Sequence, residues 1–529
     1  MATFAVVMAA LLLLPRTPST KTYMLMAEYG LLLPGLALSL PAIPSVGRSR
    51  RLPVPPVLLT LMAFLVLILL TQHFIIRDVI SGDDSAYHFQ ARVFAQGMLA
   101  AEAPPDVAVD ASSLRALFRF HHHVMVGDRW MSQYPPGWPA FLGLAIGVGL
   151  DWLLNPLLAV WILFLVWRIG ALLYSPRTGA LAVALAALSP SFQHQSSGFL
   201  SHASCGAFII SAFYLFLRAR EGSFWPRAAL SLLCLTVALT IRPYTGFWAG
   251  AVLGVLLLAE AHRRGRALRL LLVGTAAGVV FLAAFLGYNL YLHGRLSSYS
   301  SGGWAPGAMF VANAGDVWRT IGVRTRWSVQ AAMFYAFPFV FPLAAYALWR
   351  DEERRSAGWM LTALFLGTVA GYGLSKAVSG PSFGERYYYE VHFAVFLLAA
   401  RGLLLLWETW GRAALPVLSP AVASCLLVYG VHVTVYAREA TALFDPHAAV
   451  LAISRQVTEP GTVMFLPVNL GRETNPNAPR WRDAPVVYLE DPGEPLRAPV
   501  ARILGRRTWY VLAYDAGTGK ASFTLGALP

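Results

Sequence analysis

The chain has 529 residues, of which 57% are hydrophobic and only 13% are charged, and its net charge is +14. A soluble domain of this length carries about twice that charged fraction, so the composition excludes an ordinary soluble protein. The basic residues stand in short clusters between apolar segments. This pattern is typical of the cytoplasmic loops of a membrane protein and argues against a nucleic-acid-binding surface.

Apolar segments long enough to cross a bilayer recur along most of the chain. Lipid offers no hydrogen bonds to a free backbone, so we expect these segments to be helices, about 12–13 in all. A further apolar segment at 2–14 is short for a span, and it is a first crossing, a signal-like segment or a misplaced start. The expected crossings are residues 24–44, 54–76, 152–174, 177–193, 199–219, 227–241, 244–261, 267–292, 329–349, 357–376, 389–409 and 415–436.

Arginine clusters occupy every second loop between these crossings, which places those loops in the cytoplasm. Residues 137–150 are apolar, but they would reverse the side of all later clusters if they crossed the membrane. We therefore expect them to form a re-entrant or interfacial segment. The outside then holds three large regions, the loop 77–136, the loop 293–328 and the tail 437–529.

The tail differs in composition from the rest of the chain. Its residues Thr462–Pro467, Pro485–Glu490 and Thr508–Tyr514 are typical of short strands, and a helix is expected near 446–457. The predicted fold class is therefore mainly α, a polytopic helical membrane protein with a small C-terminal α/β domain. We divide the chain into N-terminal membrane segments (1–53), a transmembrane module (54–436) and an outer domain (437–529).

Unusual polar residues gather at the outer ends of the expected helices, whereas the inner loops hold mainly arginines. Asp83 and Asp84 follow the span 54–76, where a carboxylate can act as a general base or bind a cation. Two adjacent aspartates do not easily point the same way, so we expect one to face a cleft. Helix capping from Ser81 is the structural alternative, and both roles can coexist.

Arg242 and Arg386 stand at the same outer ends, where an arginine is costly unless it is paired or bound to an anion. A lipid phosphate is a natural partner for a guanidinium. The alternative for Arg386 is a salt bridge with Glu385 or Glu390. Lys376 is a weaker candidate for phosphate contact, because it can simply extend toward the interface.

The run His121–His123 suggests a metal site only weakly, because three consecutive residues cannot all point at one ion from regular structure. No metal site is therefore assigned, although a divalent cation near the acids is possible. One histidine in contact with substrate is the more plausible function of the run. Tyr387–Tyr389 is most simply an interfacial aromatic belt.

Several of these stretches together resemble the C-type (GT-C) polyprenyl-phosphate-dependent glycosyltransferases, and most closely the bacterial RgtA/B/C/D-like group. That superfamily includes the protein O-mannosyltransferase and lipid A aminoarabinose transferase branches. The resemblance covers about residues 54–436. It is carried by Asp83-Asp84-Ser85-Ala86-Tyr87 with Arg92 and Gly97, Tyr134-Pro135-Pro136-Gly137-Trp138-Pro139, Asn155-Pro156, Ser189-Pro190, Arg242-Pro243, Tyr288-Asn289 and Gly384-Glu385-Arg386-Tyr387.

The resemblance implies transfer of a sugar from a polyprenyl-phosphate donor to a lipid, glycan or protein acceptor, with inversion at the anomeric carbon. It implies a multi-pass protein of the bacterial inner membrane that acts at the outer face. Asp83 would be the base that activates the acceptor, with Asp84 second. Arg386, Arg242 and Lys376 would hold the donor phosphate. The other residues expected at the substrate are Tyr87, Arg92, His123, Tyr134, His202, Tyr288 and Glu385.

The sequence also departs from the family pattern. Tyr134 stands where the aminoarabinose branch often has lysine before the Pro-Pro pair, and Asp84 stands where glutamate is common. These departures leave the sugar and the acceptor open. Two other functions also remain open: a lipid or glycolipid flippase, whose polar residues should lie near the bilayer midplane, and a non-catalytic scaffold that displays the outer domain.

Overall fold

The computed structural model describes residues 54–71, 81–110, 112–296, 339–374, 386–416, 418–420, 446–468, 473–515 and 520–528, with a few isolated positions between them. The predicted crossing 24–44, the segment 2–14 and most of 415–436 lie outside these ranges. Lys376 and Glu385 also lie outside them.

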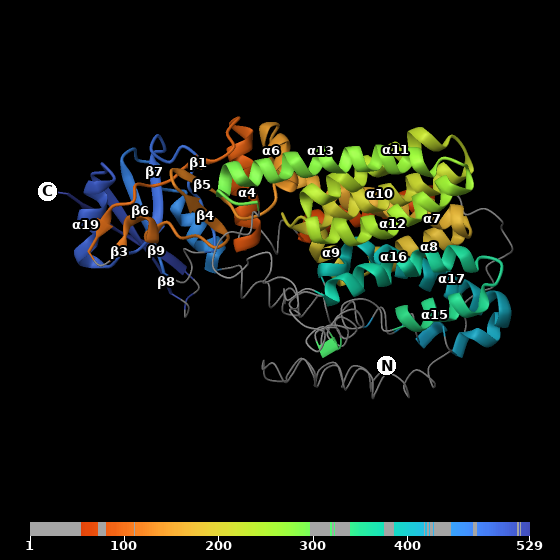
Figure 1. Cartoon of the computed structure of the whole chain (residues 1–529). Helices are drawn as coiled ribbons and strands as arrows, with labels where there is room; N and C mark the ends of the chain where they lie inside the picture. Colours follow the sequence, from red (N-terminus) through yellow and green to blue (C-terminus); the bar gives the residue numbers. More distant parts are fainter. Residues whose placement is uncertain are drawn as a thin grey trace, which may run out of the picture.

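Helices dominate the membrane module, and they pack side by side in Figure 1. Six helices of the described part are long and apolar enough to cross a membrane. The predicted fold class, a helical membrane protein with a small C-terminal α/β part, is confirmed. The helices are α3 (Val54–Thr71), α7 (Asp151–Leu173), α8 (Pro176–Ala187), α9 (Pro190–Ser197), α10 (His202–Glu221), α11 (Phe224–Ile241), α12 (Pro243–Arg263), α13 (Ala267–His293), α15 (Val340–Arg350), α16 (Arg355–Gly373), the 3₁₀ helix η3 (Arg386–Val391), α17 (His392–Trp410) and the 3₁₀ helix η4 (Gly411–Ala414).

The predicted single crossing 177–193 is wrong, because two helices replace it. α8 ends at Ala187, and α9 begins at Pro190. Ser189 caps α9 by accepting a hydrogen bond from the backbone N–H of Phe192. A cap followed by proline starts a new helix, since proline is compatible with the first turn of a helix but not with its interior.

The apolar segment after the Pro-Pro pair forms a helix of only 11 residues, α6 (Gly137–Gly147). At 1.5 Å per residue this helix is about 16 Å long, roughly half the thickness of a bilayer core. It packs against α4 (Gly82–Ala95), which carries the two aspartates. This helix is too short for a straight crossing, and its placement as a re-entrant or interfacial segment stays a prediction.

The loop between α3 and α6 holds more regular structure than the sequence indicated. After α4 it forms the antiparallel sheet β1-β5-β4, a two-stranded ribbon β2-β3 and a short helix, α5. Figure 1 places this sheet beside the C-terminal domain. These elements are β1 (Ala101–Glu102), β2 (Ala108–Val109), β3 (Ser112–Ser113), α5 (Leu114–Leu117), β4 (His123–Val126) and β5 (Arg129–Ser132).

The tail forms the expected α/β domain around a four-stranded sheet of order β7-β6-β8-β9. The three predicted strands correspond to β6 (Thr462–Leu466), β7 (Val486–Glu490) and β8 (Thr508–Asp515), and β6 runs parallel to both neighbours. A helix covers 446–454, close to the expected 446–457. The sequence analysis did not predict β9 (Lys520–Ala527) or the helix α19 (Glu494–Ile503).

The first outer loop and the tail share one hydrophobic core. Phe118 of the loop lies 5.8 Å, ring to ring, from Trp481 of the tail, and the Trp481 indole donates to the Glu102 carbonyl at 3.0 Å. Phe118 and Trp130 are fully buried, and burial of such side chains contributes roughly 1.5–3 kcal/mol each. The tail and this loop therefore form one module, and the tail helps to hold the loop in place.

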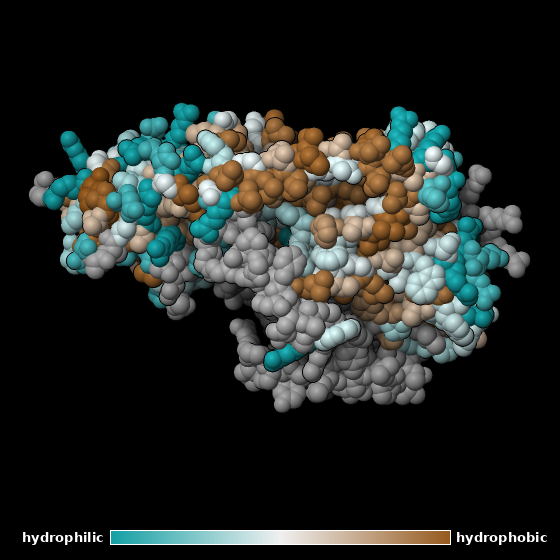
Figure 2. All heavy atoms as spheres, viewed as in Figure 1, coloured by the Kyte–Doolittle hydropathy of each residue, from teal (hydrophilic) through white to brown (hydrophobic). Residues whose placement is uncertain are grey.

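Figure 2 shows how polarity divides the surface on this side of the molecule. Apolar side chains cover the helical bundle, and hydrophilic side chains gather at its two ends. The exposed apolar residues include Leu271, Val280 and Leu282 of α13, of which little is buried inside the protein. Such a continuous apolar surface is compatible with lipid contact and with a multi-pass membrane protein.

Candidate functional site

The two aspartates stand in the first turn of α4, where they were expected to cap a helix or to serve a site. Ser81 is the N-cap residue, and its hydroxyl accepts from the Asp84 N–H at 3.2 Å and donates to Asp84 Oδ2 at 2.8 Å. Asp84 is buried, whereas the Asp83 side chain is one fifth exposed. The two carboxylates therefore have different environments: Asp84 is buried and bonded to the N-cap residue, whereas Asp83 is partly exposed.

Three side chains from distant parts of the chain surround the Asp83 carboxylate. Tyr134 donates its hydroxyl to Oδ1, and the His122 Nε2 lies 3.1 Å from the same oxygen. Arg386 of η3 donates to Oδ2 at 3.0 Å. Burial raises the pKa of Asp83, but the charges of Arg386 and His122 and the Tyr134 hydrogen bond outweigh it, so the pKa lies below its usual value. Asp83 is thus ionised at neutral pH.

Asp84 behaves differently from its neighbour. Burial is the largest cause that raises the pKa of Asp84, to about 7, and the Asp83 charge adds to the effect, while the Ser81 hydrogen bond opposes it. Only one of the two acids is therefore fully charged near neutral pH. A protonated Asp84 lets two carboxylates share one helix turn without full repulsion.

A second ion-pair cluster lies deeper in the helical bundle. The fully buried Glu390 accepts from Arg242 Nε at 3.0 Å and pairs with His202 Nδ1 at 3.0 Å. Arg242 also donates to the Ser201 hydroxyl at 3.2 Å, and Tyr87 of α4 shares a hydrogen bond of 3.0 Å with that hydroxyl. This chain of contacts links the Arg242 cluster to the helix that carries Asp83.

The two arginines lie near one aromatic ring. The guanidinium carbons of Arg386 and Arg242 are 5.7 and 5.9 Å from the ring centroid of Tyr387. The rings of Tyr134 and Tyr87 stack with their centroids 4.5 Å apart, and the Tyr134 hydroxyl bonds to Asp83. Each guanidinium already has a carboxylate counter-ion, Asp83 for Arg386 and Glu390 for Arg242. An anion bound near Tyr387 would interact favourably with both arginines.

The structure brings together six of the described residues that were predicted for the site. Asp83, Arg386 and Tyr134 are in direct contact, and Tyr87 and His202 join them through Ser201 and Glu390. Arg242 completes the group through the same two residues.

Three other predicted residues lie elsewhere. Arg92 donates to the backbone carbonyl of Asn475 in the tail at 2.9 Å. His123 packs in an aromatic cluster with Phe89 and Trp130, where burial lowers its pKa to about 3. Tyr288 is half-buried near the end of α13, and within the described residues no hydrogen bond or ion pair joins it to Asp83.

Two interpretations of the segment after residue 385 need correction. The expected alternative, a Glu390–Arg386 pair, is wrong, because Glu390 pairs with Arg242 and Arg386 pairs with Asp83. The expected aromatic belt is also wrong for Tyr388 and Tyr389, which are only 3% exposed. The 3₁₀ turn of η3 directs these two rings into the bundle instead of toward an interface.

Sequence reasoning did not select His122, Ser201 or Glu390 as site residues, although all three contact predicted ones. His122 has a left-handed backbone conformation, with φ of 62°. No sequence pattern indicated this conformation, which directs the ring of His122, instead of that of His123, toward Asp83. Among the described residues, no group of three or more His, Cys, Asp or Glu side chains is arranged to hold a metal ion.

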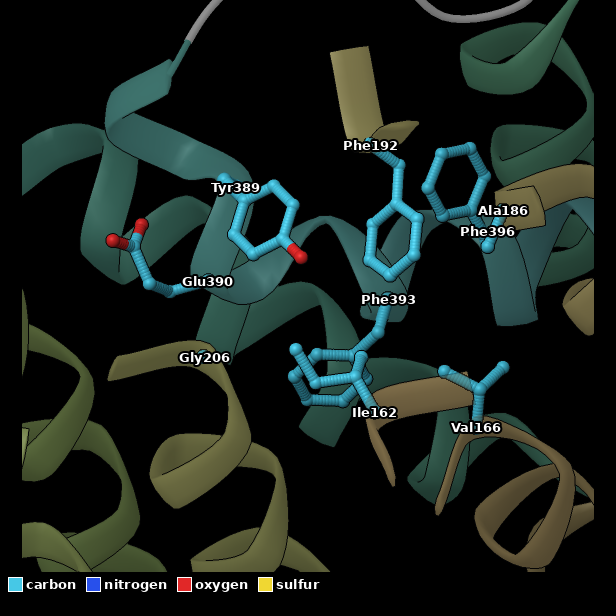
Figure 3. Close-up of a pocket in the computed structure, with 9 residues that line it drawn as sticks. All are labelled: Ile162, Val166, Ala186, Phe192, Gly206, Tyr389, Glu390, Phe393 and Phe396. Carbon is cyan, nitrogen blue, oxygen red and sulfur yellow. The ribbon is translucent and has the colours of Figure 1, made fainter. Parts of the chain in front are cut away.

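A small cavity lies under this site, between the helices that carry Glu390 and His202. Figure 3 shows that its lining is aromatic and aliphatic except at the edge formed by Tyr389 and Glu390. Glu390 is therefore the charged residue of this cavity, and the rest of the lining is almost entirely apolar. The lining residues are Ile162, Val166, Ala186, Phe192, Gly206, Tyr389, Glu390, Phe393 and Phe396.

Comparison with solved structures assigns the fold. ArnT from Cupriavidus metallidurans bound to undecaprenyl phosphate superposes with a TM-score of 0.55 and 13% identity, over 89% of this chain and 98% of that chain. The apo state of the same protein gives 0.51 and 14%, over 88% and 97%. The chain has the GT-C fold. An oligosaccharyltransferase from Archaeoglobus fulgidus in the apo form is more distant, with a TM-score of 0.46 and 11% identity over 86% of this chain and 69% of that chain.

The GT-C fold was the expectation from the sequence motifs, and it is confirmed. No protein-family model matches the chain, and no curated protein sequence matches it either. At 13–14% identity the structural likeness establishes the architecture and leaves the reaction to be argued from the site itself.

Proposed function

We propose that the protein is a glycosyltransferase that moves a sugar from a polyprenyl-phosphate donor to an acceptor at the outer membrane face. The observation that carries this proposal is one ionised carboxylate, Asp83, in contact with one of two clustered arginines at the end of an apolar bundle. The base and the anion-binding groups required for sugar transfer from a lipid phosphate are thus adjacent. The similar fold of a protein bound to undecaprenyl phosphate supports the choice of donor class.

The proposed reaction needs only this chain's own side chains. The acceptor hydroxyl or amine gives its proton to Asp83, and its lone pair attacks the anomeric carbon from the side opposite the phosphate. The bond between that carbon and the phosphate oxygen breaks, and polyprenyl phosphate leaves with the electron pair. A single displacement inverts the anomeric configuration. A retaining mechanism would need a second carboxylate as nucleophile, and buried Asp84, bonded to Ser81, does not meet that need.

Arg386 has two successive partners in this mechanism. Without donor it pairs with Asp83, which keeps the aspartate a weak base. A donor phosphate near Tyr387 offers Arg386 a stronger, bidentate partner. As Arg386 moves toward the phosphate, Asp83 loses its counter-charge and becomes a better base. Donor binding therefore precedes acceptor activation. Arg242 has no such exchange, since buried Glu390 is its fixed counter-ion.

We infer that the enzyme acts in a bacterial inner membrane with its C-terminal domain outside. The proposed lipid-linked donor and the apolar surface of the bundle support this location. The acceptor is a lipid, a glycan or a protein with a free hydroxyl or amine. The sugar is a hexose or pentose, and its identity does not follow from the charged groups of the site.

The test uses the full-length protein in lipid nanodiscs with a panel of radiolabelled undecaprenyl-phosphate hexoses and pentoses, and with envelope lipids as acceptor. Release of undecaprenyl phosphate together with a labelled, inverted product is the expected result. If no donor is turned over and the protein instead moves lipids across liposome membranes without any acceptor, the flippase alternative replaces this proposal. The variant Asp83→Asn should lose this transfer. The matched control Asp128→Asn should keep it, because the Asp128 side chain is 93% exposed in the same loop.

A further inference from the structure

The C-terminal domain reaches the start of the helix that carries the two aspartates. Glu473 Oε2 accepts a hydrogen bond from the backbone N–H of Gly82 at 3.0 Å. Its other oxygen, Oε1, pairs with His121 Nδ1 at 2.7 Å. A carboxylate at this end of α4 satisfies one of the free amides of the first helical turn and interacts favourably with the helix dipole. One acid of the tail thus holds two points of the first outer loop.

Gly82 is the contact point, and it leaves no space for a side chain. A Cβ atom there would lie 2.8 Å from His121 Cβ and 3.0 Å from Glu473 Oε2. The close approach of the tail to the helix start therefore requires glycine at this position. Since Gly82 directly precedes Asp83, any shift of this contact also shifts the carboxylate.

The contact between Glu473 and His121 acts on Asp83 through the next residue, His122. His121 precedes His122, whose left-handed φ of 62° is unusual for a residue other than glycine. Such conformations persist where surrounding contacts enforce them. Glu473 holds His121, while Gln133 and Asp83 hold the His122 ring at 2.5 and 3.1 Å. The tail therefore fixes both the aspartate and the histidine beside it.

Neighbouring contacts show that the whole segment 473–477 follows α4. The backbone N–H of Asn475 donates to the Ser85 hydroxyl at 2.7 Å, and Arg92 donates to the Asn475 carbonyl at 2.9 Å. Asn477 in turn joins this segment to strand β7 by donating to the Tyr488 carbonyl at 2.8 Å. The position of α4 is thus tied to the central sheet of the tail.

We propose that Glu473 is a positioning residue for the transfer reaction, and that the C-terminal domain completes the active site by clamping Gly82 and His121. This inference rests on the proposed function. It assigns the domain a role in catalysis beyond docking or display. Glu473 acts through the position of Asp83 and does not itself touch the reacting atoms.

The test compares Glu473→Ala with Glu473→Gln in the full-length protein. Alanine removes both contacts, and kcat should fall about 10- to 100-fold because the base is misplaced. KM for the undecaprenyl-phosphate sugar should stay within about twofold, because the arginines are untouched. Glutamine keeps an acceptor for the Gly82 N–H and should restore kcat to within about threefold of the wild-type value.

Two control variants separate positioning from mere domain docking. Trp481→Phe removes the hydrogen bond to the Glu102 carbonyl and weakens docking without touching Gly82, so kcat should be unchanged. Glu494→Ala removes an acid of the same domain whose side chain is 92% exposed, and kcat should again be unchanged. A fall in kcat in Trp481→Phe as large as in Glu473→Ala would show that docking alone matters and would overturn the proposal.

Hydrogen–deuterium exchange tests the contact independently of the reaction. Amides of residues 82–85 and 120–123 should exchange faster in Glu473→Ala than in the wild type, with no change in Glu494→Ala. Unchanged exchange, or faster exchange with unaltered kcat, overturns the proposal. If the wild type turns over no donor, the proposed function fails and the role of Glu473 fails with it. If the wild type is active and Glu473→Ala has the same kcat, the role of Glu473 is wrong while the proposed function stands.

Discussion

The ion pairs at the two ends of the helical bundle are organised differently. A first set of pairs, at the arginine-rich end, joins residues three or four positions apart, as in the exposed pairs Arg218–Glu221 and Arg355–Glu352. The same end also holds Arg401–Asp351, whose acid is buried and whose partners are 50 positions apart. At the opposite end, Arg386 and Asp83 are 303 positions apart, and His202 and Glu390 are 188 positions apart. Glu390 is fully buried there. The first set follows from local sequence, whereas the second exists only because the fold assembles it.

This difference separates charges that set topology from charges that form a site. Local, exposed pairs contribute little to stability and can be replaced one at a time. Long-range pairs around buried acids are costly to assemble. Those at the Asp83 end span 188 and 303 positions and include a fully buried glutamate, which makes this end the candidate for function. The comparison predicts a graded series of mutational effects, from the Asp83 network down to the exposed arginines.

The largest effect is expected for Asp83→Asn. The amide cannot accept the acceptor's proton, so transfer should fall by between about 100- and 10,000-fold. Steady-state kinetics with a labelled polyprenyl-phosphate sugar would measure the loss, and the melting temperature would report on folding. Near-normal transfer in Asp83→Asn, with Asp128→Asn also normal, would remove Asp83 from the mechanism.

Arg386→Gln is expected to have the next largest effect, a loss of about 100-fold in kcat/KM for the donor. The same change should alter the pH profile. Arg386 helps to hold the pKa of Asp83 below its usual value, so its removal raises that pKa. Because the base must be ionised, activity is lost as pH falls through the pKa, and the acidic limb should move to higher pH in the variant. An unmoved acidic limb would contradict the Arg386–Asp83 pair.

Arg242→Gln should reduce stability more than Arg386→Gln does. It leaves the fully buried Glu390 without its counter-ion, and breaking a buried pair in this way costs about 3–5 kcal/mol. Thermal unfolding in detergent would measure the difference. The double variant Arg242→Gln, Glu390→Gln should recover part of the loss, since no uncompensated charge remains. If the double variant is as unstable as the single one, the pair is not the cause.

Asp84→Asn should change the pH dependence of stability with little loss of transfer. The pKa of Asp84 is raised to about 7 in the folded protein, above its value of 3.8 in an unfolded chain. The folded state therefore binds this proton more tightly. The stabilisation is complete below the unfolded pKa and is lost as pH rises through the folded pKa. The wild type should lose melting temperature between about pH 4 and pH 7 from this group, and the variant should lose less.

The sequence predicted the fold class and three tail strands, because apolar length and strand composition are local properties. It also identified Asp83, Arg242 and Arg386 as candidate site residues at helix ends, with capping or a salt bridge as structural alternatives for Asp83 and Arg386. Their partners were not predictable, since the pairing of Arg386 with Asp83 and of Arg242 with Glu390 depends on how distant helices pack.

Glu473 shows the same limit most clearly. In the sequence it is one acid in a polar, turn-rich tail, and only the three-dimensional structure brings it to Gly82, 391 positions earlier. His122 was missed for a related reason. Three consecutive histidines are equivalent in the sequence, and the left-handed φ of the middle one decides which ring faces Asp83.

The smallest effect is expected for Arg218→Gln at the arginine-rich end. Arg218 pairs with Glu221 at 3.1 Å, but the two side chains are 36% and 50% exposed, so the change in unfolding free energy should stay below about 1 kcal/mol. Transfer should be unchanged, because no described contact leads from this pair to Asp83. The same kinetic and thermal assays apply. A loss of transfer in Arg218→Gln comparable to that in Arg386→Gln would mean that charge is coupled across the whole bundle, and the division into topological and functional charges would no longer hold.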